Sequence, residues 1–213
     1  MHKGFLITFE GGEGCGKSSQ IKLFTKFLEE NKIDYVLSRE PGGAEFGEMI
    51  RKILLFSKNN IDAKTEFLLF SSSRADHIKN IVKPALREGK VVVLDRFYDS
   101  SFAYQGYAGS LDLKDIKLIT DFAIDGCVPD LTILLDISYE DGFARKSQDE
   151  NLKNLDRIER KGKEYHDKVR KGYLELAKNE PERIKVIDAT KSREEISNEI
   201  KNIFLEKYNK IKK

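Results

Sequence analysis

The sequence predicts an α/β fold in which a doubly wound, five-stranded parallel sheet is flanked by helices. Five short apolar runs are separated by segments of helical period, the alternation typical of strands joined by crossover helices. Each run is continuously apolar rather than alternating, as in a parallel sheet covered on both faces. The predicted strands are Phe5–Phe9, Tyr35–Leu37, Val91–Leu94, Leu131–Leu135 and Ile184–Ile187.

Amphipathic helices are predicted beside the first and last of these strands. One follows Phe5–Phe9, and another begins at a capping-box pattern, Ser192 to Glu195. Apolar side chains recur in both every three or four residues, which gives each helix one face for the sheet. These residues are Ile21, Leu23, Phe24, Phe27 and Leu28 in the first helix and Ile196, Ile200, Ile203 and Phe204 in the second.

The 213 residues are predicted to form one domain, 1–213. The chain has 38 Lys and Arg residues against 36 Asp and Glu, so it lacks the excess positive charge that nucleic acids or membrane surfaces attract. No apolar run approaches the roughly 20 residues of a membrane span. Neither Cys15 nor Cys127 belongs to a C-x-x-C pair. We therefore expect a cytoplasmic protein with a small ligand, without nucleic-acid or membrane partners.

A nucleotide-binding motif follows the first predicted strand. Gly11 to Ser18 reads GGEGCGKS and matches G-x-x-x-x-G-K-[ST] at every fixed position. Backbone N–H groups of such a loop, at the start of a helix, surround phosphate groups. Lys17 would contact the β- and γ-phosphates and Ser18 would bind Mg²⁺. The predicted ATP-phosphate ligands are Gly11, Gly12, Glu13, Gly14, Cys15, Gly16, Lys17, Ser18 and Ser19. The alternative is a plain glycine turn.

A guanine-reading N-K-x-D sequence is also present, at Asn31 to Asp34. It lies at the far end of the helix that begins at the phosphates, roughly 20 Å away at 1.5 Å per residue. Guanine must lie beside the loop, so this sequence is interpreted as the turn before the second strand.

Charged residues also close two other predicted strands, where ligands of parallel sheets bind. Arg39 follows the second strand, and Asp95 and Arg96 close the third. Asp95 is placed like a Walker-B carboxylate for Mg²⁺, while the two arginines suit an anionic phosphate acceptor. The alternative is that Arg39 with Glu40, and Asp95 with Arg96, form surface ion pairs.

Taken together, these motifs resemble bacterial thymidylate kinases, a family of P-loop nucleoside monophosphate kinases. The resemblance covers nearly the whole chain, and the ordered combination is far more specific than the loop alone. The matching segments are Phe9 to Ser18, Arg39 to Gly43, Leu68 to Phe70 with Arg74, Asp95-Arg96, Ser100-Ser101 with Ala103 to Gly106, and Asp156 to Glu159.

The resemblance implies phosphoryl transfer from Mg²⁺-ATP to dTMP, in a homodimer. It places Phe70 against the thymine ring, with Arg74 on a base carbonyl. The other implied dTMP ligands are Ser101 and Gln105 at the base, Tyr104 at the sugar 2′ position, Glu13 near the 3′-hydroxyl, and Arg39 and Arg96 at the acceptor phosphate. On periodicity alone, Phe70 is a core residue, and Tyr104 reads equally well as an interior aromatic.

A charge-dense stretch, 140–171, is by itself typical of a solvated helical face. The resemblance implies a helical lid at about 140–163 instead. Since the loop interior, Gly12 to Cys15, holds no basic residue, the lid would supply the catalytic cation. The candidates are Arg145, Arg157 and Arg160. Cys15 departs from the smaller residue common in this family and would make the loop sensitive to thiol reagents.

Catalysis of this transfer depends on alignment and on positive charge around the moving group. The predicted catalytic residues are Lys17, Asp95, Arg96, Arg145 and Arg157, with Ser18 and Asp95 as the Mg²⁺ ligands. Two alternatives stay open: a kinase of another nucleoside monophosphate or of a deoxynucleoside on the same scaffold, and an ATP-binding module without transfer.

Overall fold

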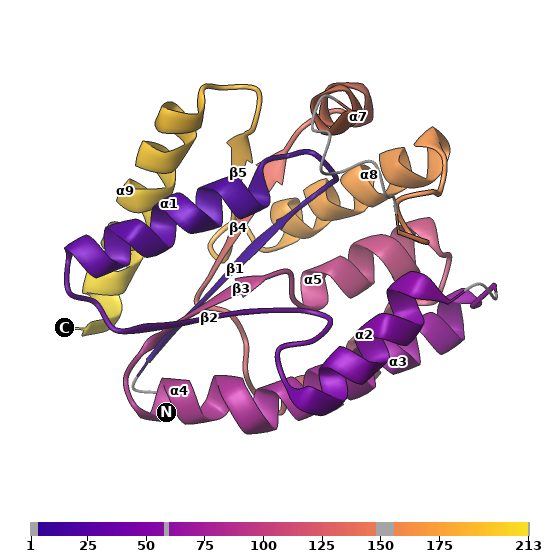
Figure 1. Cartoon of the computed structure of the whole chain (residues 1–213), viewed down its shortest axis with the longest axis horizontal. Coiled ribbons are helices and arrows are strands. Elements are labelled where there is room, and N and C mark those ends of the chain that lie inside the picture. Colours follow the sequence, from indigo (N-terminus) through magenta and orange to yellow (C-terminus); the bar gives the residue numbers. More distant parts are fainter. Residues whose placement is uncertain (1–3, 58–59, 148–155, 213) are drawn as a thin grey trace.

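A five-stranded parallel sheet forms the centre of the computed structural model, which describes residues 4–57, 60–147 and 156–212 (Figure 1). The strand order is β2-β3-β1-β4-β5. The strands are β1 (Phe5–Gly11), β2 (Tyr35–Arg39), β3 (Val91–Asp95), β4 (Leu131–Asp136) and β5 (Ile184–Asp188). All neighbours run parallel, so the α/β prediction is confirmed.

Each predicted strand is present and continues one or two residues further than its apolar run. The added residues are mostly polar, such as Glu10 in β1 and Asp95 in β3. They still pair along the ladder, with Phe9 opposite Asp95 and Asp136 opposite Asp188. The apolar pattern in the sequence therefore stops at the first polar residues of each strand end, although the backbone pairing continues through them.

One face of the sheet is covered by α1 (Lys17–Glu30) and α9 (Arg193–Lys212). Phe24 of α1 and Phe204 of α9 meet edge to face, with ring centroids 5.0 Å apart. The capping box is confirmed: Ser192 N–H donates to the Glu195 carboxylate at 2.9 Å, and Glu195 N–H donates to Ser192 Oγ at 3.3 Å. This face anchors the helix that starts at the phosphate loop.

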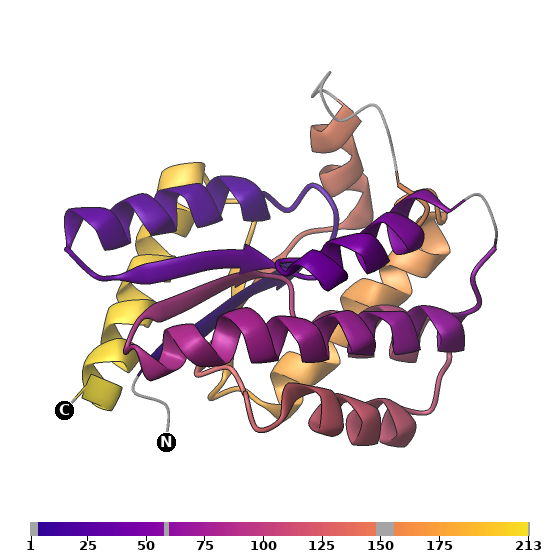
Figure 2. The same cartoon turned by 60° about the horizontal axis from the view of Figure 1, so that its bottom comes forward.

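The opposite face carries most of the other helices (Figure 2). They are α2 (Glu45–Phe56), α3 (Ala63–His77), the π-helical η1 (Ile78–Val82), α4 (Lys83–Arg87), α5 (Tyr98–Ser101), the π-helical η2 (Phe102–Ala108) and α6 (Leu113–Ile124). Two further helices, α7 (Tyr139–Ser147) and α8 (Lys163–Asn179), follow β4, and α8 packs against η2. No helix of the described ranges combines the length and apolarity needed to cross a bilayer.

Two smaller predictions concern the connections. Asn31 to Asp34 is the turn between α1 and β2, as expected from its distance from the loop. Of the predicted lid, 140–163, the part from 148 to 155 lies outside the described residues. The described part consists of α7 and a turn region that begins at Asp156.

Candidate active site

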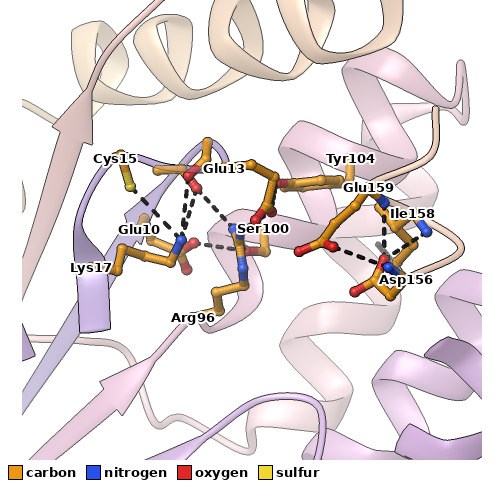
Figure 3. Close-up of polar contacts among 12 residues, drawn as sticks. Glu10, Glu13, Cys15, Lys17, Arg96, Ser100, Tyr104, Asp156, Ile158 and Glu159 are labelled. Carbon is orange, nitrogen blue, oxygen red and sulfur yellow. Dashed lines mark hydrogen bonds and ion pairs between the residues drawn. The ribbon is translucent and has the colours of Figure 1, made fainter. Parts of the chain in front are cut away.

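The phosphate loop joins β1 to α1, as the motif predicts (Figure 3). Gly16, immediately before α1, has a left-handed backbone, which places the loop N–H groups ahead of the helix N-terminus. Lys17 Nζ lies 3.4 Å from the carbonyl oxygens of Gly11 and Gly12, and 3.8 Å from Cys15 Sγ. In Figure 3 the Lys17 and Arg96 side chains both point toward the loop. The ammonium is therefore held where loop-bound phosphates would lie.

The loop makes an unusually close backbone contact with α7. A Cβ built on Gly14, where φ is +69°, would lie 1.9 Å from the Gly142 carbonyl oxygen. A Cβ on Gly142 would lie 2.3 Å from the Glu13 carbonyl oxygen. Only glycine fits at both positions. This contact fixes α7, with its basic side chains, against the phosphate loop.

Arg96 has the most bonded side chain near the loop. Its Nη2 donates to Glu13 Oε1 at 2.7 Å, and Nη1 donates to the Gly11 carbonyl at 3.0 Å and to Tyr173 Oη at 3.1 Å. The guanidinium also lies 5.1 Å from the centroid of the Tyr104 ring. Its backbone φ is +67°, a strained value for a non-glycine residue that is common at active sites. The ion pair with Asp95, the alternative interpretation from the sequence, is not found among the described residues.

The pKa values of two carboxylates beside Arg96, Glu13 and Glu10, are shifted in opposite directions. Burial raises the pKa of Glu13, but Arg96, Lys17 and Lys146 outweigh burial and hold this pKa at about 2. Glu13 is therefore a permanent anion inside the loop.

Glu10 is fully buried, and its pKa is raised to about 7 by burial and by the charge of Asp99. Its carboxylate accepts hydrogen bonds from Phe97 N–H, Ser100 Oγ and Tyr173 Oη at 2.6 to 2.7 Å. Ser100 and Tyr173 also contact Arg96 Nη1, so Glu10 supports the arginine through them.

At the other end of the site, a buried polar network surrounds Arg74. Its side chain is 1% exposed; Nε donates to Glu40 at 2.7 Å and Nη2 donates to Ser101 Oγ at 3.1 Å. Glu40 also contacts His77 Nδ1 at 3.1 Å. Arg74 Nη1 has no partner among the described residues. A buried donor without a protein partner is available to an oxygen of a bound molecule.

Gln105 lies in the same buried region, on η2. Its Nε2 donates to Glu66 Oε1 at 2.7 Å, and the other Glu66 oxygen accepts from Arg157 Nη2. Arg157 Nε donates in addition to the Leu54 carbonyl at 3.0 Å. This places the Arg157 guanidinium between α2 and α3, beside Glu66.

A cavity of about 750 Å³ joins the phosphate loop to the Arg74 network. The loop lines it from Glu13 to Ser19, as do most of the other predicted site residues: Phe70, Arg74, Asp95, Arg96, Ser101, Tyr104, Gln105 and Arg145. Phe70 is half-buried and faces this cavity while packing on the core behind it. Most of the residues predicted from the sequence motifs therefore line a single cavity.

Four predicted residues do not line this cavity: Gly11 and Gly12 of the loop, Arg39 and Arg157. Arg39 turns to Glu48, with Nη2 at 3.2 and 3.3 Å from the two carboxylate oxygens, and its side chain is 54% exposed. Arg157 is held by Glu66, whereas Arg145 lines the cavity and donates to the Ala189 carbonyl at 2.7 Å. Of the two lid arginines in the predicted catalytic set, Arg145 is the one that lines the cavity.

Sequence reasoning missed two cations that line the cavity, Arg51 on α2 and Lys146 on α7. Arg51 Nη1 donates to the Pro41 carbonyl at 2.9 Å, and burial lowers its pKa. Lys146 is 8% exposed, pairs with Glu159 and lies 3.6 Å from Glu13 Oε2. Ile50 and Leu54, which neighbour Arg51 on this helix, are buried, and this pattern would have predicted that Arg51 faces inward.

Comparison with known proteins identifies this arrangement. A family model described as thymidylate kinase matches residues 9–200. The chain belongs to the thymidylate kinase family. Its activity is accordingly that of a thymidylate kinase, EC 2.7.4.9, and the sequence resemblance is confirmed.

Relatives in this family match over most of their length. The thymidylate kinase of Clostridium novyi (strain NT) is 45% identical over 203 residues, which are 94% of this chain and 98% of that protein. The thymidylate kinase of Symbiobacterium thermophilum is 46% identical over 198 residues, covering 92% and 91%. The crystal structure of thymidylate kinase from Ehrlichia chaffeensis superposes with a TM-score of 0.75 at 33% identity, covering 94% of this chain and 98% of that one.

Proposed function

We propose that this thymidylate kinase transfers the γ-phosphoryl group of ATP to dTMP, giving dTDP and ADP, with Mg²⁺ as cofactor. The observation that carries the proposal is the continuous cavity from the phosphate loop to Arg74. One end offers a helix N-terminus and cations for phosphate groups. The other offers buried polar side chains for a base edge, including the Arg74 donor that has no partner in the described chain.

The transferring group would lie among positive charges. Lys17 and Arg96 approach the loop from different elements, and Arg145 reaches the same cavity from α7. Phosphoryl transfer spreads negative charge over the equatorial oxygens, so fixed cations lower its barrier without any covalent role for the protein. The acceptor phosphate is already an anion, and a general base is not required. Arg96 would hold that phosphate, joined by Arg51 or by Arg39 after it leaves Glu48.

Ser18 and Asp95 are suited to hold Mg²⁺. Both line the cavity and both offer hard oxygen donors, from α1 and from the end of β3. Within the described ranges no group of three or more acidic, histidine or cysteine side chains forms a complete metal cage. That fits Mg²⁺, which is usually held by one or two protein ligands together with phosphate oxygens and water. When bound, the ion would neutralise phosphate charge and orient the donor.

The base would occupy the end formed by α3 and η2. Phe70 offers a half-buried ring for stacking on thymine. Arg74 Nη1 would donate to a base carbonyl, with Ser101 and Gln105 beside it. Tyr104, whose hydroxyl lies 3.4 Å from Glu13 Oε1, would fill the space of a ribose 2′-hydroxyl. Glu13 would lie near the 3′-hydroxyl.

We also propose a homodimer formed through α2, α3 and α6, which lie side by side in Figure 2. These helices expose large apolar side chains that a monomer would leave in water: Phe46, Met49, Ile53 and Phe56 on α2, Leu68 on α3, and Leu118 and Phe122 on α6. Patches of this kind are typical of protein interfaces. The expected location is the cytoplasm, where free thiols such as Cys15 and Cys127 persist.

A coupled ADP-release assay tests the transfer. We expect ADP to appear with ATP, Mg²⁺ and dTMP together, and not when dTMP is omitted. Lys17→Ala and Arg96→Ala should each lower kcat by about 100-fold or more while the thermal unfolding curve stays cooperative. Near-normal turnover in either folded variant contradicts the proposed roles.

The same assay separates the alternatives. Another nucleoside monophosphate that outcompetes dTMP would indicate a different acceptor, and a deoxynucleoside would leave Arg96 without a phosphate partner. Slow hydrolysis that is independent of any acceptor would indicate a nucleotide-binding module.

A further inference from the structure

Glu66 is a buried carboxylate next to the base end of the cavity but outside the residues that line it. It is 1% exposed and lies on α3. Arg157 contacts one of its oxygens, and Lys161 Nζ lies 4.0 Å from the other. These two cations supply the positive charge that a buried carboxylate requires. Neither the transfer chemistry nor the contacts proposed for dTMP above assign it a role.

The neighbour of Glu66 on the cavity side is Gln105. Its amide Nε2 donates to Glu66 Oε1 at 2.7 Å. An ionised carboxylate can only accept hydrogen bonds, so the amide must present its NH₂ group to Glu66. The reversed amide would place two acceptors against each other in a buried site, at a cost comparable to a lost hydrogen bond. The orientation of Gln105 is therefore set by Glu66.

This orientation determines which polar atom Gln105 offers to a ligand. Gln105 is 2% exposed and lines the cavity, while one N–H of its Nε2 is donated to Glu66 and holds the NH₂ branch of the amide on that side. The other branch of the amide, turned away from Glu66, is the carbonyl oxygen Oε1, which is an acceptor. Arg74 Nη1, in the same wall of the cavity, is a buried donor without a partner in the described chain. The base end thus combines one donor with one acceptor.

A base edge with the opposite pattern matches this pair. Thymine presents the acceptor O4 beside the donor N3–H. Cytosine presents the donor N4 amino group beside the acceptor N3, which would set donor against donor and acceptor against acceptor. A site built to hydrogen-bond one pattern rejects the reversed one, because buried polar groups would be left unpaired.

We propose that Glu66 is a positioning residue that determines base specificity, by locking Gln105 with Oε1 toward the N3–H of thymine. The inference rests on the proposed function, in which this cavity holds dTMP. Arg157 belongs to the same arrangement, because it holds the second Glu66 oxygen. Glu66 itself touches neither substrate.

The test is Glu66→Gln, which keeps the size of the side chain but can donate to Gln105 as well as accept. We expect the ratio of kcat/KM for dTMP to that for dCMP to fall by about 10-fold, because Gln105 is free to reverse. The ratio for dTMP to dUMP should stay unchanged, since uracil carries the same O4 and N3–H edge. Glu66→Asp, which keeps an acceptor-only group, should retain the preference for dTMP over dCMP even if it lowers all rates.

Each outcome decides between distinct conclusions. If the wild-type enzyme does not phosphorylate dTMP, the proposed function itself fails. If it does, and Glu66→Gln lowers kcat/KM for dTMP, dUMP and dCMP in parallel, only the positioning role fails. Equal loss of the dTMP preference in Glu66→Gln and Glu66→Asp would also overturn it. Should Glu66→Gln not fold because Arg157 is left unpaired, the double variant with Arg157→Gln restores the charge balance, and the same ratios are read from it.

Discussion

Replacing Gly142 by alanine is expected to separate α7 from the phosphate loop. The added Cβ would lie 2.3 Å from the Glu13 carbonyl oxygen, whereas ordinary van der Waals contact begins near 3.4 Å. The atom it meets is backbone, so no side-chain rotation relieves the clash. The helix and the loop must therefore move apart by about 1 Å, because neither packed element can be compressed.

The expected effect is mainly kinetic, since α7 carries Arg145 and Lys146 into the cavity. A displacement of about 1 Å in a catalytic arrangement costs on the order of 100-fold in rate. We expect kcat of Gly142→Ala to fall by about that factor in the coupled ADP-release assay. Binding of dTMP should change little, because the base end of the cavity is built from α3 and η2 rather than from α7.

The matched control is Gly162→Ala, just before α8. A Cβ there meets no atom within 4 Å, and its φ of −68° suits alanine. This variant should keep wild-type turnover. If Gly142→Ala turns over at the wild-type rate, or if both variants lose activity equally, the contact between α7 and the loop does not position the catalytic cations.

Three further predictions concern other side chains of the site. Arg145→Met should lower kcat by about 100-fold. Arg157→Met should instead destabilise the fold by about 3 kcal/mol, because it removes the closer of the two cations that pair with buried Glu66 and leaves only Lys161 at 4.0 Å. Steady-state kinetics and urea denaturation separate the two effects. Arg74→Met should raise KM for dTMP at least 10-fold. It should also lower the free energy of unfolding by roughly 3 to 5 kcal/mol, because it removes the arginine that pairs with the buried Glu40 carboxylate. Glu10 has a native pKa of about 7 against an ordinary 4.5, so the folded protein binds this proton more tightly than the unfolded chain. Relative to Glu10→Gln, the wild-type free energy of unfolding should fall by about 3 kcal/mol as the pH rises from about 4.5 to 7, then level off.

Each of these has a result that contradicts it. Loss of turnover in a fully stable Arg157→Met protein would return that residue to the catalytic group. An unchanged KM for dTMP in folded Arg74→Met would remove Arg74 from the base site. Parallel pH profiles of unfolding for the wild type and Glu10→Gln would mean that Glu10 has an ordinary pKa in the native state.

The strands and the loop were predictable because local sequence determines them. Continuous apolar runs located all five strands of the described sheet, and only their last one or two residues, mostly polar ones such as Glu10 and Asp95, fell outside the prediction. The phosphate loop was predictable for a similar reason: its glycines act through backbone geometry and Lys17 through its ammonium, all within eight consecutive residues.

The cationic wall of the cavity was only partly predictable, because tertiary packing determines it. Arg39 ends a strand as an acceptor-binding arginine would, yet it lies against Glu48, while Arg51 on the next helix faces the cavity. The buried Ile50 and Leu54 give a local signal for Arg51, but nothing local shows that Arg39 turns to Glu48. Lys146 and Gly142 depend on how closely α7 approaches the loop, and that distance is set by packing between segments more than 100 residues apart in the sequence.

The electrostatics of the loop constrain how a phosphate would enter it. Lys17, Arg96 and Lys146 all surround Glu13, and together they hold its pKa at about 2 against the opposing effect of burial. Glu13 is therefore ionised at any pH at which the enzyme works, and protonation cannot release Arg96 from it. In its proposed role, Arg96 would exchange hydrogen bonds instead, giving up contacts to Glu13 Oε1 or the Gly11 carbonyl for phosphate oxygens. An incoming phosphate would thus replace one acceptor by a stronger one, and the cations would stay where the internal carboxylate already holds them.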